Sequence, residues 1–286
     1  MLHHTLTGNI QSHTHFESRI LGNRRDILVY LPPGYRRATT RRFPVLYMHD
    51  GQNLFDAATA FGGVEWGADE TAQRLIHQRL IEPVIIVAVA NTGENRIHEY
   101  VPTRGRIQEG KRKRSKGLLR KYGRFLIEEL KPFIDAHYRT LPDNTGLGGS
   151  SLGGLATMVL GLWYPNVFRH LAVMSPSIWW DDCVLLKMVE ELDEEHKPPL
   201  KIWLDTGTNE PGWERAGMLR DALVEKGWRL YDDLQYFEDT GAAHTEAAWA
   251  FRLDPALRFL YPPPPPVAPT RRRVRTTVVR RTVALA

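Results

Sequence analysis

The sequence predicts an α/β fold with a mainly parallel central sheet that is covered by helices on both faces. Short β-branched runs alternate with longer amphipathic stretches up to residue 261, the pattern of strands and sheet-covering helices. A glycine-rich turn joins one such run to the stretch after it. With 286 residues, 42% of them hydrophobic and 25% charged, the chain is long enough for one large buried core.

Seven short runs are expected to form the sheet. Each is mainly apolar, has four to seven residues and is rich in β-branched or aromatic side chains, or leads into the glycine-rich turn. The runs are residues 27–30, 44–48, 84–90, 145–148, 170–174, 200–204 and 234–237.

Four longer stretches are expected to be the covering helices. Residues 118–137 place apolar side chains at helical spacing, and Pro132 is expected to bend or re-register the last turn. The other three stretches are residues 152–163, 213–226 and 244–260. Because the alternation continues from end to end, a single domain is expected over residues 1–261.

The last 25 residues differ from the rest in composition. Five prolines at 262–266 favour a polyproline II rod, and six arginines follow with no other charged residue. The formal net charge is +5, so residues 1–261 carry −1. The tail, residues 262–286, is expected to be disordered and solvated. Contact with an acidic surface, RNA or anionic lipid is the less favoured alternative.

Other features argue against several classes of protein. No signal-peptide pattern and no run of about 18 apolar residues occurs, and Cys183 is the only cysteine, so we expect a cytoplasmic protein without a membrane span. Cys183 has no basic neighbour in sequence and is expected to be structural. The basic run 111–116 lacks interleaved aromatic residues, so it is expected to be a surface loop rather than a nucleic-acid site.

The segment from Gly148 to Gly154 carries the strongest chemical signal. Within it only Ser151 has glycine both two residues before and two residues after it. A nucleophile elbow of the α/β-hydrolase fold needs this spacing, because the chain turns sharply from strand to helix and side chains would clash. The Leu152 N–H would then lie at a helix N-terminus and serve as an oxyanion donor.

A serine nucleophile needs a histidine base oriented by a carboxylate, and this fold supplies them in the order Ser, acid, His. Of the histidines after Ser151, His244 lies between the last expected strand and the last expected helix and is the favoured base. Two carboxylates, Asp205 and Glu210, follow the strand 200–204. Glu210 is favoured because it lies further into the loop and can reach a neighbouring loop, with Asp205 as the alternative.

Several motifs together resemble the putative-esterase family of α/β hydrolases, which includes enterochelin esterases, feruloyl esterases and esterase D. The resemblance covers roughly residues 26–261. The matching segments are 45–55, 96–102, 129–135, 149–154, 175–180, 207–210 and 244–249.

This resemblance implies Ser151 as nucleophile, His244 as base and Glu210 as the orienting acid. It also implies the Gln52 backbone N–H as the second oxyanion donor. Trp179 and Trp180 are expected to wall the substrate pocket, with aromatic packing as the alternative, since loops at the carboxyl ends of strands line such sites. Arg96 could contact substrate or could form an internal ion pair.

The sequence therefore predicts a serine esterase that hydrolyses a small-molecule carboxylic ester through an acyl-enzyme. An acyltransferase on the same fold is one alternative, and a non-catalytic binding protein that uses its basic tail is another. No zinc-binding or dinucleotide-binding motif is present, so neither a metal nor another cofactor is expected, and no specific nucleic-acid partner is expected.

Overall fold

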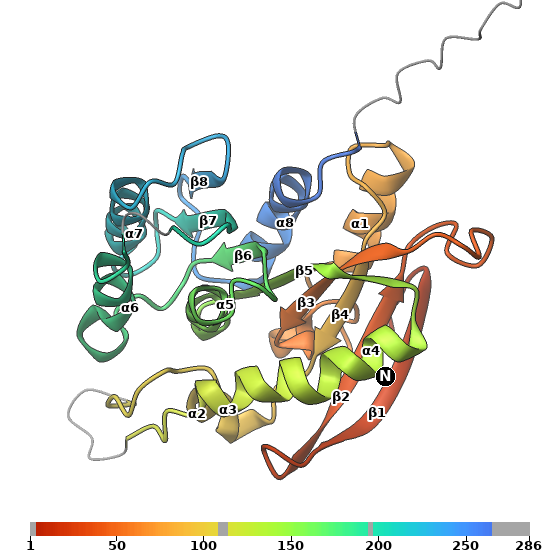
Figure 1. Ribbon diagram of the computed structural model, residues 1–286, viewed down its shortest axis with the longest axis horizontal. Coiled ribbons are helices and arrows are strands. Elements are labelled where there is room, and N and C mark those ends of the chain that lie inside the picture. Colours follow the sequence, from red (N-terminus) through yellow and green to blue (C-terminus); the bar gives the residue numbers. More distant parts are fainter. Residues whose placement is uncertain (1–3, 108–113, 194–196, 265–286) are drawn as a thin grey trace, which may run out of the picture.

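A computed structural model describes residues 4–107, 114–193 and 197–264. One eight-stranded sheet forms its centre, in the order β1-β2-β4-β3-β5-β6-β7-β8 (Figure 1). The strands are β1 (Asn9–Ser18), β2 (Asn23–Leu31), β3 (Phe43–His49), β4 (Ile85–Val89), β5 (Thr140–Ser150), β6 (His170–Met174), β7 (Lys201–Gly207) and β8 (Leu234–Asp239). Strands β3 to β8 pair in parallel, whereas β1 pairs with β2 and β2 with β4 in antiparallel fashion.

Helices cover both faces of this sheet. They are α1 (Ala68–His77), α2 (Arg96–Glu99), α3 (Leu119–Arg124), α4 (Lys131–His137), α5 (Leu152–Trp163), α6 (Trp180–Glu190), α7 (Glu214–Glu225) and α8 (Glu246–Leu260). Helices α1 and α8 pack together on one face, and α3 to α7 contribute to the core on the other (Figure 1). The predicted α/β-hydrolase fold is confirmed.

Each predicted strand and helix is found, with boundaries that shift by a few residues. The stretch 118–137 is continuous but contains a π-helical turn, Phe125–Leu130, between α3 and α4. Pro132 is the second residue after this turn. Because proline has no N–H for an α-helical bond and its ring crowds the carbonyl four residues back, the wider turn absorbs the mismatch.

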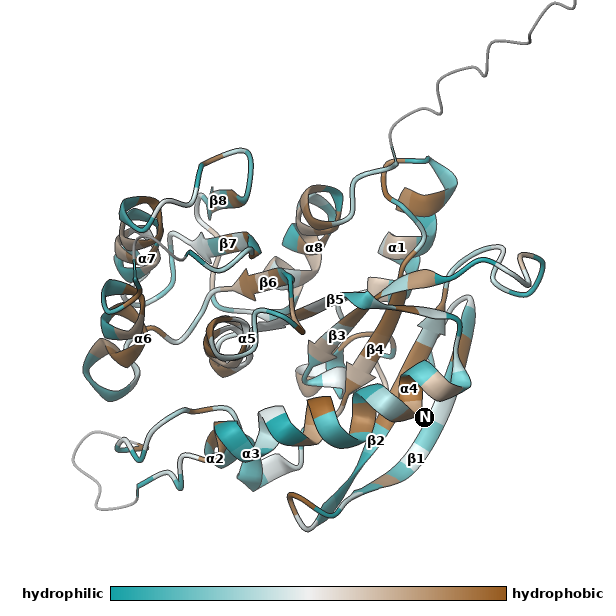
Figure 2. Cartoon of the chain, in the orientation of Figure 1, coloured by the Kyte–Doolittle hydropathy of each residue, from teal (hydrophilic) through white to brown (hydrophobic). Residues whose placement is uncertain are grey.

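The strand β1 and the helices α1, α2 and α6 were not predicted. Strand β1 lies at the edge of the sheet, and half of its residues are exposed. Its sequence therefore lacks the run of apolar residues by which a buried strand is recognised. Figure 2 shows the contrast, since the central β3 and β4 are mainly hydrophobic whereas β1 carries hydrophilic residues. Edge strands need less apolar surface than central ones, so their sequences are harder to recognise.

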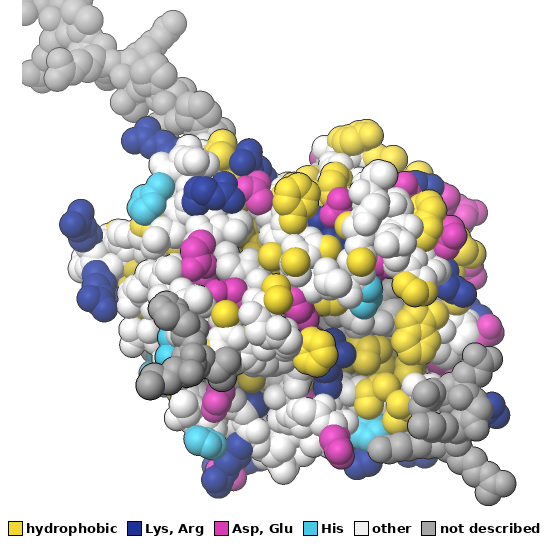
Figure 3. Space-filling view, turned by 180° about the vertical axis from the view of Figure 1, so that it is seen from behind, with side chains coloured by type: hydrophobic (Ala, Val, Ile, Leu, Met, Phe, Trp, Pro, Cys, Tyr) yellow, Lys and Arg dark blue, Asp and Glu magenta, His cyan; other side chains and the backbone are white. Residues whose placement is uncertain are grey.

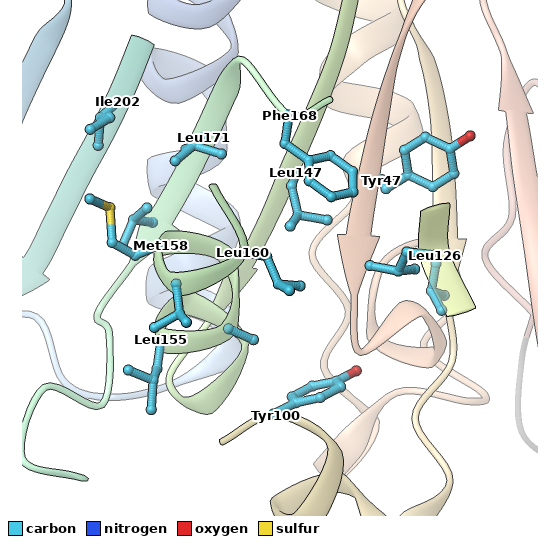
Figure 4. Packing of buried hydrophobic residues seen from close by; sticks show 14 of the residues in the cluster. Tyr47, Tyr100, Leu126, Leu147, Leu155, Met158, Leu160, Phe168, Leu171 and Ile202 are labelled. Atoms are coloured by element: carbon cyan, nitrogen blue, oxygen red, sulfur yellow. The ribbon is translucent and has the colours of Figure 1, made fainter. Parts of the chain in front are cut away.

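Helix α5 joins the elbow segment to the core. In Figure 4, Met158 and Leu160 of α5 lie toward Leu147 of β5 and Leu171 of β6, and Leu155 projects from the same helix. All five side chains are fully buried. Burying a side chain of this size contributes about 1.5–3 kcal/mol, so α5 is firmly anchored below the turn that precedes it.

Two further observations concern membrane-spanning helices and the distribution of charged side chains on one face. No helix within the described ranges is both long and apolar enough to cross a bilayer. On the face seen in Figure 3, Lys and Arg side chains are scattered among acidic and hydrophobic ones. Most of the tail, residues 265–286, together with residues 111–113 of the basic run, lies outside the described residues.

Candidate active site

Ser151 occupies the turn between β5 and α5. Its backbone has φ 59° and ψ −121°, a strained conformation for a residue with a side chain. A Cβ at Gly149 would lie 3.0 Å from the His49 side chain, and one at Gly154 would lie 2.7 Å from the Met174 carbonyl oxygen. Side chains at Gly149 and Gly154 would therefore crowd the segments that pack against this turn.

His244 lies just before α8 and contacts Glu210 directly. Its Nδ1 is 2.8 Å from Glu210 Oε2. The Glu210 side chain is buried, whereas the His244 side chain is 38% exposed. Thr245 begins α8 as its N-cap, where its side chain accepts a hydrogen bond from the Ala248 N–H, so the backbone beside His244 is fixed.

Glu210 has donors on both of its oxygens. Oε1 accepts from the Ser175 hydroxyl (2.6 Å), from the Gly207 N–H (2.9 Å) and from Arg252 Nη2 (3.3 Å), while Oε2 faces His244. Burial raises the pKa of Glu210, but the hydrogen bonds from His244, Ser175 and Gly207 outweigh it, so this pKa lies below its ordinary value. Glu210 is thus an ionised acceptor aimed at the imidazole.

Asp205 lies inside β7 rather than in the loop and is fully buried. Its Oδ2 accepts from Trp203 Nε1 (2.7 Å), and its Oδ1 accepts from the Ser175 N–H (3.2 Å). Burial raises the pKa of Asp205 to about 6, although Arg252 lowers it. The structure brings Glu210, and not Asp205, to His244.

Ser151 and His244 line one cavity of about 690 Å³. Among the described residues, Ser151 Oγ makes a hydrogen bond to Ser177 Oγ (3.4 Å) and none to His244. Hydrogen bonds between a nucleophile and its base are often long without substrate and tighten in the complex. Part of the remaining lining is apolar or aromatic, from Phe61, Val64 and Trp249.

Two backbone segments could supply oxyanion donors. Leu152 is the first residue of α5, so its N–H has no acceptor within the helix and lies at the positive end of the helix dipole. Gln52 lies in a short 3₁₀ turn, Gly51–Asn53, and lines the same cavity. A Cβ at Gly51 would lie 2.4 Å from the Ala88 backbone, so this turn packs closely onto β4.

Arg96 both lines the cavity and forms an ion pair. Its Nε and Nη2 each lie 2.7 Å from an Asp50 oxygen, a bidentate contact. Burial raises the pKa of Asp50, but Arg96 outweighs it and the pKa is lowered. Because Asp50 immediately precedes the Gly51–Asn53 turn, this pair fixes the segment that carries Gln52.

The two predicted pocket tryptophans differ in position. Trp179 is 48% exposed and lines a small neighbouring recess of about 40 Å³ that also contacts His244. Trp180 is fully buried, and its Nε1 donates to Thr103 Oγ1 (3.0 Å). Trp180 packs in the core and lines neither cavity, so the prediction that it walls the pocket is wrong and the packing alternative holds.

Sequence reasoning missed several residues of this site. Ser175, Glu246, Trp249 and Arg252 all lie within the hydrogen-bonded surroundings of Glu210, His244 and the cavity. The sequence contained one indication of the role of Arg252. This arginine lies three residues after Trp249 and four before Ala256, so a cation lies on the apolar, buried face of α8.

One group of carboxylates within the described residues is close enough together to hold a metal ion. It consists of Glu65, Asp69 and Glu70, whose oxygens lie within 4.8 Å of one another. None of the three lines the cavity that contains Ser151 and His244. The cavity itself presents the Ser151 hydroxyl and the His244 imidazole, and Glu210 contacts the imidazole.

Comparisons with known proteins give similarities over most of the chain. A family model described as "Putative esterase" matches residues 18–260. The chain is 26% identical over 253 residues to "Uncharacterized protein YbbA" of Bacillus subtilis, covering 84% of this chain and 93% of the relative. It is 24% identical to "Ferri-bacillibactin esterase BesA" of the same organism, covering 70% and 69%. A solved structure of the siderophore hydrolase EstA from Aspergillus nidulans has a TM-score of 0.71 at 20% identity, covering 88% and 94%.

Proposed function

The chain belongs to the putative-esterase family and is a carboxylic-ester hydrolase, and we propose on that premise that it works as a serine esterase through an acyl-enzyme on Ser151. His244 is the general base in this proposal, and Glu210 orients it. The N–H groups of Gln52 and Leu152 stabilise the oxyanion. The substrate is a small-molecule ester.

The observation that carries the proposal is the contact between His244 Nδ1 and Glu210 Oε2 at 2.8 Å, beside a strained serine in the same cavity. A carboxylate at Nδ1 fixes the tautomer that leaves Nε2 free to accept a proton. That arrangement is needed for serine catalysis and has no purpose in a scaffold that only binds.

The proposed reaction has two halves. The Ser151 oxygen attacks the ester carbonyl carbon as His244 Nε2 takes the hydroxyl proton, and the tetrahedral intermediate collapses when His244 protonates the leaving alcohol. Water then attacks the acyl-enzyme and gives a proton to His244, and His244 passes this proton to the Ser151 oxygen as the carboxylic acid is released. Glu210 stays ionised throughout, in keeping with its lowered pKa.

The lining of the cavity bears on the substrate. Phe61 and Val64 are exposed at its rim and Trp249 lies within its wall, which favours an ester with an apolar or aromatic portion. Arg96 is held by Asp50 and is therefore not a free counter-ion for an anionic substrate.

The direct test is labelling with a fluorophosphonate probe, because only an activated serine reacts with it. We expect one label at Ser151, blocked by prior incubation with an activated acetyl ester, and release of acetate from that ester. Product analysis with an added alcohol acceptor separates hydrolysis from acyl transfer. Absence of labelling on folded protein, with no ester turnover, would refute the proposal.

A further inference from the structure

Arg252 is a fully buried cation in the middle of α8. Arginine is almost never fully buried unless it is paired, since removing its charge from water is costly. It does not line the cavity that holds Ser151, so it is out of contact with any substrate there. The burial of Arg252 must therefore be explained by its contacts with other residues of the protein.

The guanidinium lies among three carboxylates. Nη2 is 3.3 Å from Glu210 Oε1, Nη1 is 3.4 Å from Asp205 Oδ1, and Nε is 3.9 Å from Asp239 Oδ2. These carboxylates come from β7, from the loop after it and from the end of β8. Arg252 thus contacts β7, the loop that carries Glu210 and the end of β8 at the same time.

A second contact of Arg252 sets the direction of a hydrogen-bond chain. The Ser175 oxygen accepts from Arg252 Nη2 (3.0 Å) and from Trp249 Nε1 (3.0 Å). A hydroxyl has one proton and two acceptor sites, so with both acceptor sites filled the Ser175 proton must be donated. It goes to Glu210 Oε1, 2.6 Å away. The chain runs from Arg252 through Ser175 to Glu210 and leaves Oε2 for His244.

The charges explain why a cation is needed here. Arg252 contacts Asp205, Asp239 and Glu210, and burial together with the charge of Glu210 raises the pKa of Asp205. The other charged groups nearby are Glu246, Asp50 and Arg96, which line the cavity with His244, and Arg215, which lines the recess shared by Glu210 and His244. Of these cations, Arg96 is already paired with Asp50. Without a cation, repulsion between buried carboxylates would favour protonation of one of them. A protonated Glu210 could no longer stabilise the imidazolium that forms during catalysis.

From this geometry we propose that Arg252 is a positioning residue, which holds Glu210 ionised and turned toward His244 through direct contact and through Ser175. This inference rests on the proposed function, because it assigns to Arg252 a role in the same Ser151, His244 and Glu210 machinery.

The test compares the pH profiles of kcat/KM for Arg252→Gln and Arg252→Lys with that of the native protein on an activated acetyl ester. Loss of the cation favours the protonated form of Glu210, so the acidic limb should move to higher pH by about 1 unit in Arg252→Gln. We expect kcat to fall about 10- to 100-fold through misplacement of Glu210, with KM nearly unchanged.

Arg252→Lys keeps the charge but loses the guanidinium fork. It should restore the position of the acidic limb while kcat recovers only in part. Arg258→Gln is the matched control, since Arg258 is on the same helix, is exposed and pairs with Asp254 four residues earlier. This control should leave the profile and kcat as in the native protein.

If Arg252→Gln does not fold, Arg252→Lys and Ser175→Ala decide, with folding checked by circular dichroism. A folded Ser175→Ala should lower kcat about 10-fold without changing KM, because the hydroxyl link to Glu210 is lost. Folded Arg252 variants with native kcat and an unmoved acidic limb would overturn the proposal and leave Arg252 a purely structural residue. Failure of the proposed function itself is distinguishable, because native protein would then resist the fluorophosphonate probe.

Discussion

The two ends of the parallel strands both carry a cavity, yet only one gathers reactive groups. The carboxyl end has the cavity of about 690 Å³ with Ser151 and His244, and the amino end has one of about 410 Å³. The amino-end cavity is lined by Leu141, Pro142, Asp143, Asn144, Arg169 and His170. No serine is among these residues, although a histidine is present.

The histidines at the two ends show what the difference depends on. Burial lowers the pKa of His170 to about 4, assisted by Lys201 and Arg169, and no described residue makes a hydrogen bond to its Nδ1. His244 instead has a carboxylate at Nδ1 and faces a serine across the cavity. A cavity beside a histidine is therefore not enough, and the carboxyl end differs by the convergence of a nucleophile, a base and an oriented carboxylate.

Ser151→Ala should give the largest effect at the carboxyl end. Removal of one oxygen eliminates the nucleophile, so kcat on an activated acetyl ester should fall by at least about 10⁴-fold while the melting temperature stays near native. Ser150→Ala is the matched control and should be much milder, because Ser150 lacks the glycine flanks of the elbow. Substantial turnover by Ser151→Ala would remove the nucleophile assignment.

Glu210→Gln should come next, because the two buried carboxylates of this end have different tasks. Loss of the acceptor at His244 Nδ1 should lower kcat by roughly 10²- to 10⁴-fold, with a loss of thermal stability at neutral pH that is smaller than that of Asp205→Asn. Asp205→Asn should mainly lower stability, since both Asp205 oxygens accept hydrogen bonds within the core. An active Glu210→Gln beside a stable, inactive Asp205→Asn would transfer the role to Asp205.

The same two carboxylates should affect stability with opposite pH dependence. The folded pKa of Glu210 is lowered, so its stabilisation is present above its ordinary pKa of 4.5 and is lost as pH falls through the lowered value. The folded pKa of Asp205 is raised from 3.8 to about 6, so its ionisation destabilises the fold as pH rises between these values.

Melting temperatures measured from pH 3 to 7 check this prediction. The difference in melting temperature between native protein and Glu210→Gln should become smaller as the pH falls below 4.5. The difference in melting temperature between native protein and Asp205→Asn should become smaller as the pH rises toward 6. If both differences changed in the same direction with pH, the assigned pKa shifts would be contradicted.

Deletion of residues 262–286 should have the smallest effect on ester turnover. It tests whether residues that follow the amino end of the strands contribute to activity. Tyr261, where the domain is predicted to end, has its ring 5.2 Å from that of His170, and its carbonyl accepts from the Glu82 N–H (3.0 Å). Tyr261 therefore lies at the amino end of the strands, the end opposite Ser151. Turnover of a neutral ester should stay within about twofold, since no group of the proposed site is lost. A large drop would mean that the tail contributes to the site.

The sequence alone determined the fold class, the elbow and the most plausible base. Residues 145–163 encode a strand, a glycine-flanked serine and a helix within one continuous segment, and such local patterns need no distant partner to be recognised. The order of Ser151, the carboxylates and His244 along the chain indicated which histidine is the base, because the loops that meet at the site follow a fixed order in this fold.

Only the tertiary structure decided the contacts between distant segments. It brought Glu210 rather than Asp205 to His244, buried Trp180 in the core, and set Arg252 of α8 against carboxylates that precede it by 13 to 47 residues in the chain. The physical reason is that a side chain's role depends on its distance to partners and on its burial. Both follow from how the sheet and helices pack, and neither is encoded in local spacing.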